Sequence, residues 1–285
     1  MQARKRPAKF LALVSATAFS LVPYFSHAKD WKEATIALEG AYEPWNVTRP
    51  DGTLDGFEPE LAANLCARAQ IKCKLIAQDW DGMMAALKVG KFDVIMDGLA
   101  ITEERKKEIA FSVPYANTPA TFAVAKNGSL RNLPGTGTEI ELSGGPAADK
   151  ALLEPLRRAL KGKVIGLQAG VSFSPIIYSH FGDVATIREY KSAAEHDLDL
   201  NSGRIDAAID DATYFSSAFS KSENKNLQFA GPRMKGRAFG PGEALGFRLS
   251  DGDLKNKFDG AIKAALADGT VQRLSEKWFR MNVAP

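Results

Sequence analysis

The segment FDVIMDGLAITEERKKEIAFSVPY, residues 92–115, holds an apolar strand, a turn and the start of a short helix. The apolar run from Phe92 to Met96 is short enough for a buried strand, and Asp97-Gly98 interrupts it. Thr102 is suited to cap a helix whose first two residues are glutamates, because negative charge favours the positive end of the helix dipole. The segment therefore predicts a strand that ends beside a helix start.

Arg105 is the unusual residue of this segment, because a cation does not suit the first turn of a helix. A guanidinium held beside free backbone N–H groups is a good receptor for a carboxylate. A surface arginine that pairs with Glu108, three residues on, explains the same sequence. The segment by itself leaves both interpretations open.

Short apolar strands alternate with amphipathic helices on both sides of this segment. A first unit comprises strand 35–38, helix 58–69, strand 74–77, helix 82–89 and strand 92–96. A second unit comprises strand 164–168, helix 174–181, strand 184–187, helix 192–201 and strand 205–209. This βαβαβ order predicts an α/β fold with two lobes, each a mostly parallel sheet flanked by helices.

The remaining segments connect the units and close the chain. They comprise a Gly/Pro/Thr-rich loop at 127–145, a helix at 150–160, a strand at 244–249 and helices at 253–267 and 271–279. A tail without a unit of its own is expected to return to the first lobe.

We therefore predict lobe 1 at 29–117 and 232–285 and lobe 2 at 118–231. The chain then crosses between the lobes near 116–119 and near 229–232. Two crossings permit hinge bending and limit independent motion of the lobes.

The first 28 residues have the three parts of a secretory signal peptide. A basic start with four Lys/Arg precedes an apolar stretch from Phe10 to about Phe25, and Ser26-His27-Ala28 supplies a small-x-small exit. A membrane anchor fits less well, since the stretch is shorter than the roughly 20 residues of a span and Pro23 interrupts it. Removing four positive charges and no negative ones lowers the formal net charge from +3 to −1, so composition gives no reason to expect nucleic-acid binding. We expect an exported protein.

Two cysteines, Cys66 and Cys73, lie seven residues apart, at the end of a predicted helix and the start of a strand. In an oxidising compartment a disulfide is expected, and two buried thiols are the alternative. Two cysteines without a nearby histidine make a poor metal site, so we predict neither a metal nor a cofactor.

Motifs along nearly all of the mature chain resemble those of the periplasmic solute-binding proteins of ABC importers for polar amino acids. The likeness is strongest to the lysine/arginine/ornithine and histidine binders and their octopine- and nopaline-binding relatives, and the Cys66/Cys73 spacing resembles the disulfide of the basic amino acid binders. The motifs are EGAYEP (39–44), GFEPEL (56–61), DWD (79–81), the segment 97–115, KVIGLQAG (163–170), GRID (203–206), DGT (268–270) and WF (278–279).

This resemblance implies a two-lobe type II periplasmic binding protein fold with a two-segment hinge. It also implies a periplasmic location, a monomer, and an ABC permease of the inner membrane as partner. The segment around 130–160 is longer than in the basic amino acid binders and resembles the opine-type relatives. The resemblance does not explain the role of this segment.

The resemblance assigns ligand contacts to both ends of an amino acid. Arg105 matches the residue that holds the α-carboxylate, and Ser172 matches a hydroxyl residue near a helix start that assists it, although 170–172 is also explained as an ordinary turn. Asp211 matches the acid that receives the ammonium group, with a simple helix N-cap as the alternative. Asp210 is expected to face the other way. A closed, dry site needs both charges of a zwitterion to be paired.

Four further residues match positions around the ligand side chain. Tyr42 and Trp80 match aromatic walls, and an indole stacked on a desolvated guanidinium contributes roughly 1–2 kcal/mol. Glu39 matches an acid that meets a basic side chain, and Gln168 matches a position that lines the same region. Core packing is the alternative for the aromatic residues, and a solvated carboxylate is the alternative for Glu39.

Three positions depart from the family, which often has serines where this chain has Asp97, Gly98 and Ala100. Gly98 keeps a backbone carbonyl for the ligand, but Ala100 has no hydroxyl, which removes about 1 kcal/mol of hydrogen bonding to a primary ammonium. A secondary amine, as in opines, has fewer protons to satisfy. Asp97 adds an acid near Glu39, and the pair suits a guanidinium, an ammonium or the hydroxyls of a mannityl opine. A turn cap is the alternative for Asp97.

An enzyme is the main competing class, because some dehydratases and lytic transglycosylases share this architecture. After signal removal only His180 and His196 remain, and neither lies in a matched motif. The chain has no Gly-x-Ser-x-Gly, P-loop or His-Glu-x-x-His motif, so we predict no catalytic residues. A sensor ectodomain, or a binder that presents its ligand to a receptor, is a third class. The predicted function is uptake of a polar, basic amino acid or an opine, with a non-basic amino acid or a mannityl opine as the alternative.

Overall fold

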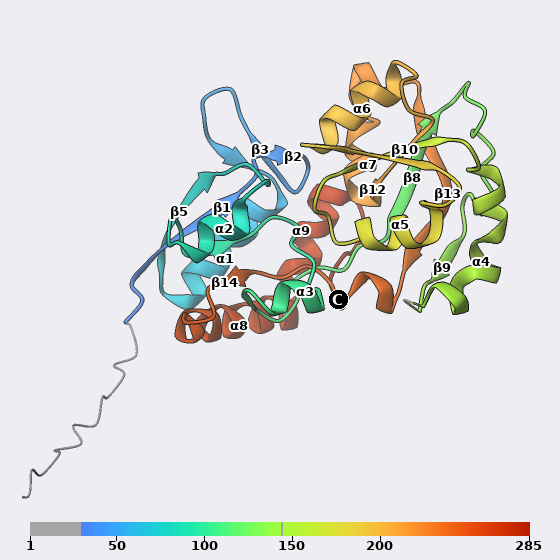
Figure 1. The fold of residues 1–285 in the computed structure, drawn as a ribbon. Helices are drawn as coiled ribbons and strands as arrows, with labels where there is room; N and C mark the ends of the chain where they lie inside the picture. Colours follow the sequence, from blue (N-terminus) through green and yellow to red (C-terminus); the bar gives the residue numbers. More distant parts are fainter. Residues whose placement is uncertain (1–29, 144) are drawn as a thin grey trace, which may run out of the picture.

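Two sheets, each covered by helices, organise the computed structural model, which describes residues 30–143 and 145–285 (Figure 1). The predicted signal peptide at 1–28 lies outside these residues. Within the described ranges, no helix combines the length and apolar character that crossing a bilayer requires.

The first sheet has the strand order β5-β1-β6-β14-β7. β1 is parallel to β5 and β6, whereas β14 is antiparallel to β6 and β7. The strands are β1 (Glu33–Leu38), β5 (Lys72–Ala77), β6 (Val94–Ile95), β7 (Ala110–Phe111) and β14 (Gly246–Phe247). The C-terminal segment therefore supplies an inner strand to a sheet that begins at the N-terminus.

Helices cover both faces of the first sheet. On one face Ile36 and Leu38 share a core with α1, α8 and α9, and on the other Ala37 packs with α2. Because both faces of β1 are buried toward its C-terminal end, Ile36-Ala37-Leu38 is an unbroken apolar run. The helices are α1 (Phe57–Ala69), α2 (Met83–Lys88), α3 (Glu103–Lys106), α8 (Gly252–Ala267) and α9 (Thr270–Phe279).

The second sheet has the order β11-β10-β12-β8-β13-β9. β10 is parallel to β11 and β12, β8 is antiparallel to β12 and β13, and β9 is parallel to β13. The strands are β8 (Ala120–Ala125), β9 (Glu139–Glu141), β10 (Val164–Gln168), β11 (Thr186–Tyr190), β12 (Ala207–Asp211) and β13 (Leu227–Lys235). The helices around it are α4 (Pro146–Ala159), α5 (Ser174–Phe181), α6 (Ala193–Asn201), α7 (Ala212–Ala218), and the 3-10 turns η1 (Ser222–Asn224) and η2 (Arg237–Phe239).

Several elements differ from the sequence prediction because they are short or lack periodicity. A small antiparallel sheet, β2 (Ala41–Tyr42), β3 (Asn46–Thr48) and β4 (Leu54–Asp55), was not predicted. β9 lies in the expected loop 127–145, and the two sheets are parallel only over β5-β1-β6, β11-β10-β12 and β13-β9.

The predicted lobe boundary at 231 falls inside β13. Residues 233–235 pair with β9 and keep the chain in the second sheet to Lys235. Neither β13 nor β9 was anticipated, which is why the predicted boundary lies within a strand. The division of the chain into two lobes is otherwise still a prediction.

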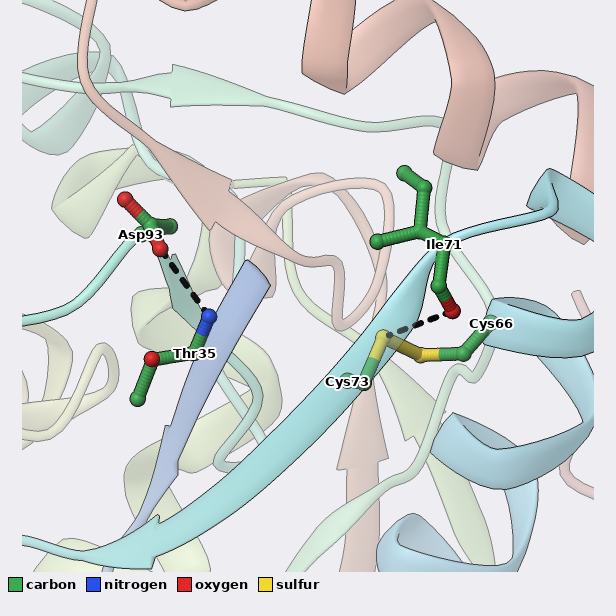
Figure 2. Close-up of a disulfide and its surroundings, with 5 residues drawn as sticks. All are labelled: Thr35, Cys66, Ile71, Cys73 and Asp93. Carbon is green, nitrogen blue, oxygen red and sulfur yellow. Dashed lines mark hydrogen bonds between the residues drawn. A yellow bond between two sulfur atoms is a disulfide. The ribbon is translucent and has the colours of Figure 1, made fainter. Parts of the chain in front are cut away.

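Cys66 and Cys73 form the predicted disulfide, with an S–S distance of 1.99 Å (Figure 2). The bond joins the last turn of α1 to β5 at the edge of the first sheet. Nearby, the backbone N–H of Thr35 donates to the Asp93 carboxylate at 2.9 Å, so β1 is tied to the loop before β6. These links hold the first sheet and its helices together away from the cavity described next.

Candidate functional site

One cavity lies where parallel strands of both sheets end. Glu39 follows β1 and Asp97 follows the residue after β6, while Gln168 and Asp211 are the last residues of β10 and β12. Ligands of open α/β sheets bind at such carboxyl ends. All ten residues predicted to contact a ligand line this cavity: Glu39, Tyr42, Trp80, Asp97, Gly98, Ala100, Arg105, Gln168, Ser172 and Asp211. Their contact with a ligand is still a prediction.

Arg105 is buried, with 8% of its surface exposed, in the short helix α3. Thr102 caps this helix as expected, because its hydroxyl accepts the Arg105 backbone N–H at 3.2 Å. The guanidinium donates to the backbone carbonyls of Ala100 at 2.8 Å and Gly170 at 3.0 Å, and its Cζ lies 5.3 Å from the centre of the Trp80 ring. The alternative pairing with Glu108 does not form, since that carboxylate accepts from Lys88 at 2.5 Å.

Burial lowers the pKa of Arg105 to about 10, and Asp97 acts in the opposite direction. The side chain therefore keeps its charge at neutral pH. No carboxylate within residues 30–143 and 145–285 forms a salt bridge with it. Its present partners are neutral carbonyls, and a carboxylate is a stronger acceptor for a guanidinium than a carbonyl.

A buried polar network fixes the turn at Asp97-Gly98. Asp97 Oδ1 accepts from the backbone N–H of Glu39 at 2.9 Å and from Asn46 Nδ2 at 2.8 Å. Glu58 accepts from the backbone N–H of Gly98 at 2.7 Å and from Asn46 Nδ2 at 2.7 Å. Asp97 therefore links the end of β6 to the end of β1. This role goes beyond the local turn cap that was its alternative interpretation.

The second oxygen of Asp97, Oδ2, is buried without a hydrogen-bond partner among the described atoms. Burial, with the charges of Glu39 and Glu58, raises the pKa of Asp97 well above its usual range. An acid held in this way gains from any donor or cation that enters the cavity.

Glu39 and Gln168 meet across the cavity from different sheets. Gln168 Nε2 donates to Glu39 Oε1 at 3.1 Å and to the Lys191 carbonyl at 3.1 Å. Burial raises the pKa of Glu39 to about 7, with the Gln168 amide acting against it and Asp210 and Asp79 acting with it. The alternative of a fully solvated carboxylate does not describe Glu39, which is half-buried.

Asp211 lines the cavity and also caps α7. Its Oδ1 accepts from the backbone N–H of Thr213 at 2.7 Å and from the Thr213 hydroxyl at 2.6 Å, and its Oδ2 accepts from the Thr118 hydroxyl. Burial raises the pKa of Asp211 to about 6 against the lowering effect of these hydroxyls. Asp211 therefore does cap α7, as the alternative interpretation stated. Its carboxylate still lines the cavity wall.

The aromatic residues Tyr42 and Trp80 are half-buried walls of the cavity. Trp80 Nε1 donates to the Ala169 carbonyl at 3.0 Å. The Tyr42 ring stacks on Tyr214 with 5.1 Å between ring centres, and its hydroxyl donates to Asp210 at 2.6 Å. Asp210 does not line the cavity, in agreement with the expectation that it faces another way.

Ser172 is half-buried and lies two residues before α5 (Ser174–Phe181). It does not cap this helix, whose N-cap residue is Phe173. Gly98 and Ala100 bring only backbone groups and a methyl group to the wall. These two positions therefore offer no hydroxyl group to a ligand amine.

Sequence reasoning missed three polar residues of the cavity, Asn117, Thr118 and Glu243. Glu243 is 8% exposed and forms isolated antiparallel bridges with Ala100 and Ala116. Burial, followed by the charge of Asp211, raises its pKa to about 8. The preceding Gly-Pro-Gly run looks like an exposed turn, and only the bridges place Glu243 inside the protein. No periodic pattern could have found it.

Neither histidine of the described chain lines the cavity. His196 is fully buried, with Nδ1 3.2 Å from Asp197 and Nε2 3.1 Å from Asp210. Burial lowers the pKa of His196, but the two adjacent carboxylates, Asp197 and Asp210, outweigh this effect and raise the pKa to about 9. In the part of the chain that the structure describes, no cluster of three or more His, Cys, Asp or Glu residues is arranged to hold a metal.

The fold is that of a two-lobe, type II solute-binding protein, and the cavity lies where its two sheets end. The sequence pattern of the bacterial extracellular solute-binding proteins, family 3, matches residues 34–281, and the chain belongs to this family. It is 37% identical over 272 residues to the octopine-binding periplasmic protein of Rhizobium meliloti, covering 89% of this chain and 92% of that one. It is 34% identical over 279 residues to the L-arginine-binding protein of Pseudomonas aeruginosa, covering 96% and 98%.

A solved structure supports the same assignment. The chain superposes with a TM-score of 0.69 and 28% identity on a periplasmic His/Glu/Gln/Arg/opine family-binding protein from Silicibacter pomeroyi in complex with lysine, covering 88% of this chain and 99% of that one. The family consists of solute-binding proteins, which agrees with the prediction of a binder in place of an enzyme.

Proposed function

We propose that this protein binds a basic amino acid or an opine in the periplasm and delivers it to an ABC permease. The observation that carries the proposal is one cavity lined by a buried guanidinium, Arg105, and by the acids Asp211, Asp97 and Glu39. Relatives named for octopine and for L-arginine support this ligand class. The permease would use ATP, and this chain would supply selectivity.

The Arg105 end of the cavity suits the α-carboxylate of the guest. Its two present acceptors are the carbonyls of Ala100 and Gly170. A carboxylate that replaced them would make two charge-assisted hydrogen bonds. Ser172 lines the same cavity and can add a hydroxyl donor.

The acids suit the basic groups of the guest. Asp211, fixed by Thr118 and Thr213, would receive the amino group. Glu39 and Asp97 would receive a guanidinium or ammonium side chain, with Trp80 as a stacking surface. A basic guest places positive charge where burial has raised the pKa values of these carboxyl groups.

We infer that the site is completed when the two lobes close. In the structure, four hydrogen bonds join the two sides of the cavity. These are Tyr42 to Asp210, Trp80 to Ala169, Arg105 to Gly170 and Gln168 to Glu39. We place the crossings at 116–119 and between Lys235 and Glu243, where Glu243 bridges Ala116. A guest that contacts both lobes stabilises the closed state by its differential affinity.

A mannityl opine or a non-basic amino acid is the second candidate. Burial raises the pKa of Glu39 to about 7 and the pKa of Asp97 well above its usual range, which favours the neutral forms of both groups. A neutral carboxyl group both donates to and accepts from hydroxyl groups. The same two residues therefore fit a polyol chain at the side-chain end.

A thermal-shift panel tests the proposal on the mature protein. The panel comprises L-arginine, L-lysine, L-ornithine, L-histidine, octopine, nopaline and mannopine, with L-leucine and L-glutamate as controls. At about 100 times Kd a true ligand raises Tm by about 5–10 °C. Recovery of the unchanged ligand after incubation excludes turnover. A panel without any shift would refute the proposal, and a shift with mannopine alone would favour the second candidate.

A further inference from the structure

Glu243 is a buried acid of the cavity with one carboxylate oxygen left unpaired. Its Oε2 is buried and has no hydrogen-bond partner within the described part of the chain, and only 8% of the residue is exposed. Its Oε1 lies 3.1 Å from the Thr118 hydroxyl. An unpaired buried acceptor costs free energy unless a donor reaches it.

The Thr118 hydroxyl is shared by two carboxyl groups. It contacts Asp211 Oδ2 and Glu243 Oε1, yet a hydroxyl has a single proton to donate. If Thr118 donates to Asp211, Glu243 can bond to the Thr118 oxygen only as a donor, in its protonated form. The raised pKa of Glu243, about 8 through burial and the charge of Asp211, agrees with this proton count.

Glu243 also lies beside the position that lacks a hydroxyl. Its backbone bridges Ala100, and both residues line the cavity. Ala100 offers no side-chain acceptor to a ligand amine. The carboxyl group of Glu243, on the segment that bridges Ala100, can supply such an acceptor to the same cavity.

We infer that Glu243 determines specificity: together with Asp211 it forms a two-acid receptor for a positively charged amino group and releases its proton when that group binds. The inference rests on the proposed function and narrows it to guests with a charged amine at this end. The proton passes to solvent, the guest keeps its own protons, and no covalent bond of the guest changes. A guest with an uncharged group here would leave Glu243 protonated.

Two titratable groups act on Glu243 and enter any measurement of this exchange. Asp211 approaches from the end of β12, and the buried Tyr115 hydroxyl approaches from the segment before β8. Tyr115 is held neutral, since burial and neighbouring acids raise its pKa well above the usual range. Asp211, Glu39 and Asp97 also have raised pKa values, so the protons that Glu243 releases are identified by comparing the wild type with Glu243→Gln.

Calorimetry of the mature wild type and of Glu243→Gln tests the inference. L-arginine and octopine are titrated at about pH 7 and about pH 8, each in two buffers of different ionisation enthalpy. The amide keeps the shape of the neutral acid and can donate to Thr118, so the ligand-free Tm should be unchanged. We expect the variant to bind about tenfold more weakly and to release fewer protons than the wild type. The difference in proton release should be larger near pH 7 than near pH 8, because the ligand-free acid, with a pKa of about 8, is more fully protonated at the lower pH.

Equal affinity and equal proton release in wild type and Glu243→Gln would overturn the inference and leave the proposed function standing. No binding of either ligand by the wild type, together with a thermal-shift panel without any shift, would instead refute the basic amino acid and opine assignment. Glu33→Gln, an exposed acid at the start of β1, is the matched control and should change neither quantity. If Glu243→Gln does not fold, absence of proton release by the wild type near pH 8 overturns the inference.

Discussion

The Arg105 side and the acid side of the cavity differ in how their charged groups are satisfied. Arg105 has two carbonyl partners and an indole face. Asp97 and Glu243 each retain a buried oxygen without a partner among the described residues. The guanidinium is therefore hydrogen-bonded without a ligand, whereas the acids are stabilised most by a ligand that supplies hydrogen-bond donors.

Burial also acts on the two sides in opposite ways. It lowers the pKa of Arg105 to about 10, so the guanidinium stays charged, and it raises the pKa of Asp211 to about 6 and of Glu39 to about 7. One side thus carries a permanent charge, and the other carries charges that depend on pH and on the guest.

Arg105→Ala should have the largest effect, because it removes the only permanent charge that we assign to the guest carboxylate. We expect affinity for L-arginine to fall by about 100-fold or more, since truncating one partner of a buried charge pair costs about 2–5 kcal/mol. Calorimetry measures the affinity, and circular dichroism checks that the fold is kept. Arg105→Lys keeps the charge without the forked geometry and should fall between. Unchanged affinity would move the carboxylate site elsewhere.

Asp211→Asn should weaken binding of L-arginine by about tenfold or more, equivalent to about 1.4 kcal/mol. The amide cannot pair with an ammonium, although it can still accept from Thr213 and cap α7. The matched control is Asp183→Asn, an exposed carboxylate paired with Arg157, which should leave affinity unchanged. If both variants bind alike, the amino group contacts another residue.

Affinity for a basic guest should rise with pH, whereas the free energy of unfolding of the ligand-free protein should fall. An acid whose pKa is higher in the folded than in the unfolded protein stabilises the fold at pH values below its unfolded pKa. This stabilisation is lost as the pH rises through the folded pKa, which is near 6 for Asp211 and near 7 for Glu39. A cation prefers the ionised acids, so its binding gains over the same range. Calorimetry and urea unfolding between about pH 5 and pH 8 measure both trends. A flat affinity profile would contradict the charge assignment.

Ala100→Ser should have a smaller effect and distinguish a primary from a secondary amine. An added hydroxyl can contribute about 1 kcal/mol, so affinity for L-arginine should rise by about fivefold, and affinity for octopine should change less. Titration of both ligands into the wild type and the variant measures the ratio. An equal gain for both ligands would show that the hydroxyl does not meet the amine.

Replacing both Cys66 and Cys73 by serine should have the smallest effect on affinity, because the disulfide joins α1 to β5 outside the cavity lining. Closing a loop of this length contributes about 2 kcal/mol of stability. We expect a lower Tm and an affinity within twofold of the wild type. A large loss of affinity would mean that the edge of the first sheet controls the geometry of the cavity.

Much of the fold could be predicted because it rests on local patterns. The run at β1 and the periodic helix α1 bury apolar surface on their own, and Thr102 caps α3 through a contact three residues away. β9 is three residues long and exists only through pairing with β13, far along the chain, so no local pattern identifies it. For the same reason the sequence did not show that β13 continues past the predicted boundary at 231.

The amino-acid sequence by itself determined the α/β order, the disulfide and the identities of ten residues that line the cavity, since strand ends, helix starts and family motifs are local. Only the tertiary structure decided which acids share a hydroxyl, which carbonyls hold Arg105 and that Glu243 is buried beside Ala100. Most of these facts depend on distant segments meeting where two sheets end: Arg105 and Gly170 are 65 residues apart, and Thr118 lies 93 residues from Asp211 and 125 from Glu243. Burial at that meeting point, which no local pattern encodes, changes the pKa values of the acids and makes them respond to a guest.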